Sequence, residues 1–274
     1  MTTRKVYDPV WECIYCGKPH TKDEPLGKEH IVPYFLIGED GLILPRASCT
    51  CCSEKTGDFE KICARDLFGT ARIVTNAPTR NPEERPKHLP ATVIQDGTST
   101  EVQIPIENYP YLHLNFFQFG LCNLITGKQW TGGQMAKLRS IDATLLNVKT
   151  TTPPSAEVEV HSKLDPVAFF KLLCKIAHGY AVAIHGVKSH QWLLPDLIRG
   201  LANNFSDFVG GGSPLPQDSP ESLLPPGLNS IPTGWNFVLS CGRVRGAGGI
   251  DYLAVKIGLF YDFVPPYWVI VAKT

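Results

Sequence analysis

The chain lacks a surplus of charge of either sign. Its 274 residues carry 26 basic and 26 acidic side chains, and charged residues make up only 19% of the total. Proteins that bind nucleic acid through a broad surface usually have an excess of positive charge, so the composition gives no support to that class. An interaction with nucleic acid would have to depend on a local site or a local patch.

Long apolar runs are missing as well. No apolar segment follows the first five residues, so we expect no signal peptide. The most apolar stretch, 167–184, is interrupted by Lys171, Lys175 and His178, and no run of about 18 apolar residues exists. We therefore expect a cytoplasmic protein without a membrane span. A hydrophobic content of 43% and an aromatic content of 10% predict a folded core rather than disorder.

Cysteine is abundant, and its placement is informative. Six of the nine cysteines precede residue 64, and they include two Cys-x-x-Cys pairs, Cys13 with Cys16 and Cys49 with Cys52. In a reducing compartment such pairs indicate a metal site rather than disulfides. Two thiolates from each of two tight turns can complete a tetrahedral Zn²⁺ site. We predict a structural zinc site at these cysteines, and Cys51 stays open as a substitute ligand or a spare thiol.

Composition divides the chain into three regions. Residues 1–75 form a cysteine-rich unit, and residues 76–92 are rich in proline and charge, which is typical of a connector. We expect residues 93–274 to form a mixed α+β domain with antiparallel strands. The predicted fold class is therefore α+β, with a small zinc-stabilised unit followed by a larger domain.

Local patterns predict the elements of the larger region. We expect strands at 92–94, 101–104 and 112–114, helices at 165–185 and 194–206, and strands at 236–244, 252–260 and 267–272. The dipeptide Asp96-Gly97 is typical of a hairpin turn. Asp165 followed by Pro166 is a helix-start signal. Residues 209–234 are rich in glycine and proline, so we expect an irregular loop there.

The expected helix at 165–185 carries three polar residues at related positions. Lys171, Lys175 and His178 are spaced i, i+4 and i+7, which places them on one stripe of a helix. We interpret this stripe as a solvated helix face. A phosphate-binding face is the alternative interpretation.

The segment between the two cysteine pairs contains the motif LGKEHIVP at residues 26–33. It places an acidic residue, Glu29, directly before His30, followed by two apolar residues and a proline. Each Cys-x-x-Cys pair forms a turn of the kind called a zinc knuckle. The order of first knuckle, acidic-His motif and second knuckle leading into a helix resembles the HNH endonuclease family over about residues 10–65. With the motifs CIYCG, PRASCTCCSEKTGDFEK and FKLLCKIAHGYAVA, the wider chain is similar to uncharacterised bacterial HNH proteins of comparable length.

The resemblance implies a ββα-metal fold, in which two strands and a helix present the active site. It implies one catalytic Mg²⁺ or Mn²⁺ ion, separate from the structural zinc. His30 would act as the general base, since a pKa near 6.5 suits proton transfer at neutral pH. Glu29 would be the first ligand of the cation. The implied activity is hydrolysis of phosphodiester bonds in DNA, in a context such as phage defence or restriction.

Two positions depart from the family pattern. The asparagine that would orient the histidine has no counterpart before the second knuckle, where Ser48 or a backbone carbonyl would have to serve. The family also takes a metal ligand or catalytic residue from the helix after the second knuckle. On that helix Ser53 and Glu60 share one face. We favour Glu60 as the missing ligand, with Ser53 or Asp58 as alternatives; a solvated Glu60 without a role is the other interpretation.

The predicted partner is DNA, and RNA is not excluded. Lys28, Arg65 and Arg72 lie near the motif or beyond the proposed catalytic helix, so we expect them to contact backbone phosphates. A homodimer or a protein partner from the same system stays open.

Two other functions compete with the nuclease. The chain could be a non-catalytic zinc module that binds nucleic acid or a partner protein, which the missing asparagine and the balanced charge favour. Alternatively, the C-terminal half could sense a ligand and thereby gate the nuclease. The sequence names no such ligand.

Overall fold

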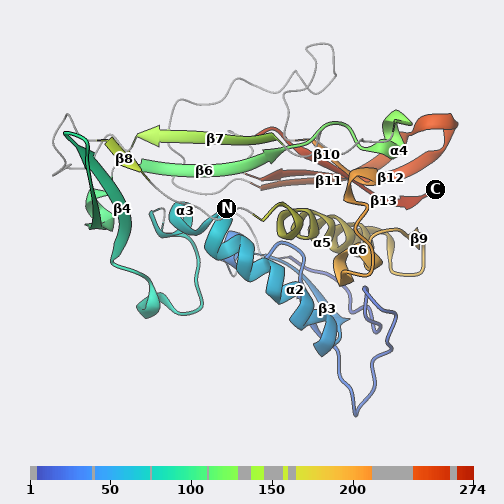
Figure 1. The fold of residues 1–274 in the computed structure, drawn as a ribbon. Coiled ribbons are helices and arrows are strands. Elements are labelled where there is room, and N and C mark those ends of the chain that lie inside the picture. Colours follow the sequence, from blue (N-terminus) through green and yellow to red (C-terminus); the bar gives the residue numbers. More distant parts are fainter. Residues whose placement is uncertain are drawn as a thin grey trace.

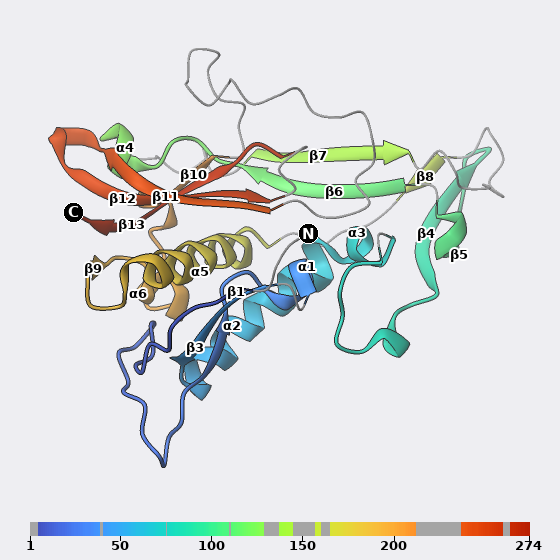
Figure 2. The ribbon, with the colours of Figure 1, turned by 180° about the vertical axis from the view of Figure 1, so that it is seen from behind.

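A long buried helix, α5 (Pro166–His185), lies in the middle of the fold, with a sheet on one side and the cysteine-rich unit on the other (Figures 1 and 2). It begins as the sequence predicts. The side chain of Asp165 accepts a hydrogen bond of 2.9 Å from the backbone N–H of Ala168, and Pro166 occupies the first helical position. The predicted helix at 165–185 is therefore confirmed.

The structure is a computed structural model. It describes residues 5–38, 41–74, 76–109, 111–128, 137–144, 157–159, 165–211, 237–259 and 264–274. Most of the loop expected at 209–234 lies outside the described residues.

The cysteine-rich unit consists of two antiparallel strands followed by a helix. Strand β2 (Gly27–His30) pairs with β3 (Leu42–Ser48), and α2 (Thr50–Ile62) follows β3 at once. The other elements of this part are β1 (Lys5–Val6), parallel to β3, α1 (Tyr34–Ile37), a π-helical turn at Cys63–Leu67 and α3 (Gly69–Val74). The order β2-β3-α2 is a ββα arrangement.

The sheet that covers α5 is antiparallel. Its strands run in the order β10-β13-β12-β11, and β9 also pairs with β13. The bounds are β9 Gln191–Trp192, β10 Val209–Gly211, β11 Phe237–Arg245, β12 Asp251–Leu259 and β13 Tyr267–Lys273. The last three strands confirm the predictions at 236–244, 252–260 and 267–272. Almost every residue of β12 is buried, because this central strand is covered on both faces.

Two smaller sheets complete the described strands. The bounds are β4 His88–Gln95, β5 Thr98–Pro105 and β8 Glu157–Glu159 in one, and β6 Tyr111–Gln118 and β7 Lys137–Thr144 in the other. Asp96 and Gly97 join β4 to β5 with positive φ angles of 52° and 75°, as a type I′ hairpin turn requires. The predicted hairpin is confirmed. Strand β4 begins at His88, within the segment 76–92 that was predicted to be a connector.

The remaining α-helices of the described residues are short. They are α4 (Asn123–Thr126) and α6 (Pro195–Arg199). The predicted helix at 194–206 is therefore wrong in its length. Gly200 ends α6 in the left-handed conformation, with φ of 76°, and glycine is the residue that adopts it without strain. The combination of helices and antiparallel sheets confirms the predicted α+β class.

One hydrophobic core joins the cysteine-rich unit to the rest of the chain. Phe68 lies 6.3 Å from Phe169 of α5, measured between ring centroids, and Phe169 lies 5.3 Å from Tyr267 of β13. All three belong to one cluster of buried residues. Packing is therefore continuous across residue 75, and the division into 1–75, 76–92 and 93–274 stays a prediction.

The prediction that the polar stripe on α5 faces solvent is wrong for two of its three residues. Lys175 is 1% exposed and His178 is 0% exposed, because α2 packs on one side of the helix and the sheet on the other. Among the described residues, α5 is the one helix long and apolar enough to cross a membrane, yet 72% of its apolar window is buried inside the protein. It is the core helix of the fold.

His178 makes folding sensitive to mild acid. Its Nε2–H donates to the carbonyl oxygen of Ile14 at 2.7 Å, and burial lowers the pKa of His178 to about 4. A histidine in the unfolded chain titrates near pH 6.5, so the unfolded state binds more protons between these values. We expect the free energy of unfolding to fall by about 3 kcal/mol as the pH drops from about 6.5 to about 4.

The measurement is urea denaturation of the wild type and of His178→Gln across this pH range. The glutamine keeps a donor for Ile14 but does not titrate, so its stability should depend less on pH by about the same amount. Loss of metal in acid affects both proteins and cancels in the difference. Equal pH profiles for the two proteins would show that His178 does not carry the effect.

Candidate functional site

The first cysteine pair lies in a tight turn. The carbonyl oxygen of Cys13 accepts a hydrogen bond of 2.8 Å from the N–H of Gly17, which closes the turn around Cys16. Gly17 has a φ of 73°, a conformation that a side chain would strain. The turn directs both thiols of the pair toward one side.

The second pair lies at the start of α2. Cys49 is the N-cap residue and Cys52 falls in the first turn, so the two sulfurs are on the same side of the helix. All four predicted ligand atoms lie within 4.8 Å of one another, and the Sγ atoms of Cys16 and Cys49 are 3.7 Å apart. Tetrahedral zinc with Zn–S bonds of about 2.3 Å requires sulfurs about 3.8 Å apart. The four cysteines could therefore hold a metal ion such as zinc, and Cys51 is exposed outside this cluster.

The ββα arrangement brings together the acidic residues that the sequence singled out. Glu29 lies in β2 and Glu60 in the last turn of α2. Both carboxylates contact the ammonium group of Lys175 on α5, at 2.8 Å from Glu29 Oε1 and 2.9 Å from Glu60 Oε1. The two glutamates that were expected to share a divalent cation thus share a lysine.

Lys175 is fully satisfied in this position. Besides the two carboxylates, its Nζ donates to the backbone carbonyl of His30, and the carbonyl of Ile31 lies 3.4 Å away. An ammonium has three donors, and each of them has an acceptor here. Burial alone would lower the pKa of Lys175, but the charges of Glu29 and Glu60 raise it, so the lysine stays charged at neutral pH.

Burial has the opposite effect on the pKa of Glu29, whose residue is 5% exposed. It raises the pKa of this carboxyl, and the charge of Lys175 counteracts that rise. The carboxylate therefore depends on the lysine to remain ionised in a dry environment. Glu60 is less enclosed, with a side chain that is 23% exposed.

The residues do not fit Mg²⁺ or Mn²⁺ between Glu29 and Glu60. A cation at that place would have to displace the ammonium of Lys175, which is 1% exposed and would be left as a second buried charge. The alternative ligands do not join the glutamates. Ser53 precedes Glu60 by two helical turns, about 10 Å along the axis, and Asp58 is exposed beside Lys61, at 3.9 Å.

His30 lies at the end of β2 and is half-buried. Its ring meets the ring of Tyr34 edge to face, with 6.2 Å between centroids. The guanidinium of Arg80 lies 5.4 Å from the centroid of the same tyrosine. The predicted general base and an arginine therefore both lie against the ring of Tyr34. Ser48, which could have oriented His30, donates instead to the neighbouring carbonyl of Cys49 at 3.4 Å.

The predicted phosphate contacts have different surroundings. Lys28 and Arg65 are exposed and accessible to a ligand. Arg72 is half-buried, and its guanidinium donates to the carbonyl oxygens of Phe35, Ala64 and Pro78 at 3.0–3.3 Å. These hydrogen bonds fix Arg72 in the fold.

Sequence reasoning missed the role of Lys175. A lysine inside the most apolar helix of the chain was the available signal, because a charge in such a place is rarely buried unless it is paired. The sequence could not name its partners, since Lys175 lies 145 residues beyond His30 in the chain.

Comparison of the chain with protein-family models, curated proteins and solved structures gave no match.

The metal cluster predicts different outcomes for two exposed cysteines. Cys16→Ser should abolish tight zinc binding and lower the melting temperature, because it removes one of four ligands. Cys51→Ser is the matched control and should retain one zinc per chain. Atomic emission on gel-filtered protein measures both. Full zinc content in Cys16→Ser, or loss of zinc in Cys51→Ser, would contradict the assignment.

Removal of the buried ammonium should destabilise the fold strongly. Lys175→Met leaves two carboxylates close together without a cation, and we expect the free energy of unfolding to fall by about 3–5 kcal/mol. Lys171→Met on the same helix is the control and should cost less than about 1 kcal/mol. Adding Glu29→Gln to Lys175→Met should recover part of the loss. Urea denaturation tests this, and similar values for the two lysine variants would exclude a structural role of the bridge.

Proposed function

We propose that the protein is an HNH-type hydrolase of phosphodiester bonds in nucleic acid, with His30 as the general base. The ββα arrangement of β2, β3 and α2 carries the proposal, because it presents His30 on β2 between two cysteine pairs that could hold a metal, in the order typical of that family. The cluster would hold zinc as a structural ion. DNA is the proposed substrate, with RNA as a second substrate class, and phage defence in the cytoplasm is the proposed context.

The chemistry proposed for His30 is a proton transfer. One ring nitrogen takes a proton from a water molecule as the water oxygen forms a bond to phosphorus. The bond between phosphorus and the 3′ oxygen breaks, and the leaving oxygen takes a proton from solvent. The proposal assigns no step to Mg²⁺ or Mn²⁺, because Lys175 occupies the space between Glu29 and Glu60.

The contacts of Lys175 also favour a second candidate function, that of a non-catalytic zinc module that binds nucleic acid. In that case the carboxylates of Glu29 and Glu60 serve the stability of the fold alone. Their contacts with a fully buried ammonium are what such a role requires.

The test is a cleavage assay with plasmid, single-stranded DNA and RNA, with and without added Mg²⁺ or Mn²⁺. We expect cleavage by the wild type and a loss of about 10²–10⁴-fold in rate for His30→Ala, since a general base contributes that much. His190→Ala, at a half-buried histidine five residues beyond the end of α5, should cleave like the wild type. Circular dichroism and zinc content should be equal in all three proteins.

The two candidates give opposite results. If the wild type leaves all three nucleic acids intact under every condition, the enzyme proposal fails and the binding module stands. Cleavage that His30→Ala retains in full would remove His30 from the mechanism.

A further inference from the structure

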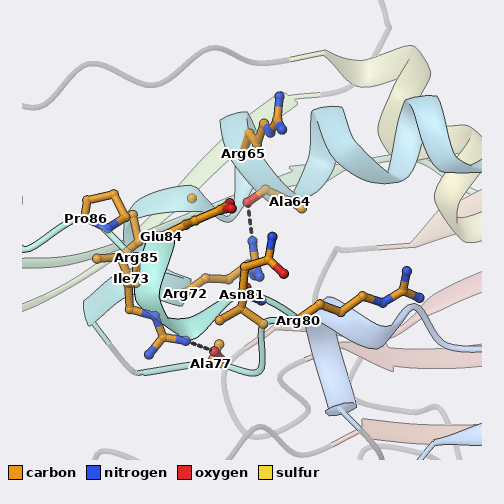
Figure 3. A pocket seen from close by; sticks show the side chains of 12 residues that line it. Ala64, Arg65, Arg72, Ile73, Ala77, Arg80, Asn81, Glu84, Arg85 and Pro86 are labelled. Carbon is orange, nitrogen blue, oxygen red and sulfur yellow. Dashed lines mark hydrogen bonds between the residues drawn. The ribbon is translucent and has the colours of Figure 1, made fainter.

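A pocket of about 420 Å³ lies where the π-helical turn after α2, α3 and the segment 77–86 meet (Figure 3). Four arginines line it, Arg65, Arg72, Arg80 and Arg85, together with a single glutamate, Glu84. The lining therefore has a formal surplus of three positive charges. Its volume is in the range of small-ligand sites.

Two of the arginines form the fixed part of the pocket. The guanidinium of Arg72 lies at its centre, held by three backbone carbonyl oxygens, and Arg85 donates to the carbonyl of Ala77 along one side (Figure 3). Backbone carbonyls orient a guanidinium without neutralising it. Arg65 and Arg80 are exposed and reach outward from the rim.

The fixed arginines are close enough to repel each other. Burial lowers the pKa of Arg72, and the charge of Arg85 lowers it further. Within the part of the chain that the structure describes, none of the four arginines forms an ion pair with a carboxylate. Half-buried like charges without a counterion are costly, and an anion in the pocket would remove that cost.

We propose that this pocket binds a phosphate group carried by a nucleotide or by a nucleic-acid strand. Arginine suits this ligand because its planar donor fork matches phosphate oxygens in pairs. The two fixed guanidiniums would bind the phosphate, and the two outer ones would contact a neighbouring phosphate or the sugar. Glu84 opposes any anion, so it weakens binding and limits the pocket to ligands that use several arginines at once.

The pocket adjoins the region of His30. Arg80 packs against one part of the Tyr34 ring and His30 against another, at 5.4 Å and 6.2 Å from its centroid. A strand anchored by its phosphate in the pocket would pass beside His30. This role in placing a substrate depends on the proposed function, whereas the binding of phosphate does not.

The binding test uses His30→Ala protein, so that cleavage does not interfere. Its probes are a fluorescent single-stranded DNA 12-mer, adenosine monophosphate and inorganic phosphate, followed by fluorescence polarisation or calorimetry. The double variant Arg65→Gln with Arg80→Gln changes only exposed side chains and should weaken binding by about 10-fold or more, as loss of charged hydrogen bonds predicts. Lys55→Gln, an exposed charge on α2 outside this pocket, is the matched control and should bind within about 2-fold of the parent.

A variant that is expected to tighten binding completes the design. Glu84→Gln should tighten binding, because it removes the acidic side chain from the lining. Preference for the 12-mer identifies a nucleic-acid strand as the ligand, and preference for adenosine monophosphate identifies a nucleotide. The proposal is overturned if no probe binds, or if the arginine variant and the lysine control bind alike while melting temperatures show that all proteins are folded. Because no cleavage is measured, a failed nuclease proposal does not affect the result.

Discussion

The contact between Lys175 and the pair Glu29 and Glu60 is the interaction on which the structure depends. It joins the central helix to β2 and to α2, so one ammonium connects α5 with two elements that precede it by more than 100 residues. Buried ion pairs of this kind contribute little net free energy compared with an apolar core of equal volume, yet they penalise any arrangement that leaves a charge without its partner. We infer that the bridge acts mainly on specificity, because an arrangement of α5 that separates Lys175 from Glu29 and Glu60 would leave buried charges unpaired.

The same bridge defines what the site can do. Two carboxylates and one lysine carry a formal charge of minus one, and each donor of the lysine is already used. For the phosphate ligand that we propose, positive charge must then come from elsewhere, and the four arginines of the neighbouring pocket would supply it. In that proposal the buried lysine organises the scaffold and the arginines face the ligand. A metal-dependent nuclease combines these two tasks at one cation.

Short-range patterns in the sequence predicted what depends on short-range physics. The cysteine pairs, the Asp165 cap of α5 and the Asp96-Gly97 turn each act within a few residues, and each is found as expected. The burial of Lys175 and His178 was beyond such patterns, because a polar stripe on a helix looks the same whether water or another element covers it. The predicted length of α6 was wrong for a related reason. The helical sequence pattern continues past Gly200, but the backbone adopts the left-handed conformation at that residue and ends the helix. Whether His30 performs chemistry is likewise not a property of its motif alone.

The distance of the bridge along the chain has a consequence for biosynthesis. The four clustered cysteines and both glutamates are synthesised at least 115 residues before Lys175, since Glu60 is the last of them. At a synthesis rate of about 5–20 residues per second, the nascent unit waits for roughly 6–23 seconds without its ammonium. During that time Glu29 lacks the cationic partner that stabilises it in the interior, so its carboxylate stays hydrated. The four cysteines are already present in the chain at this stage. Any metal that the four cysteines hold would thus bind to the nascent chain before Lys175 completes the bridge.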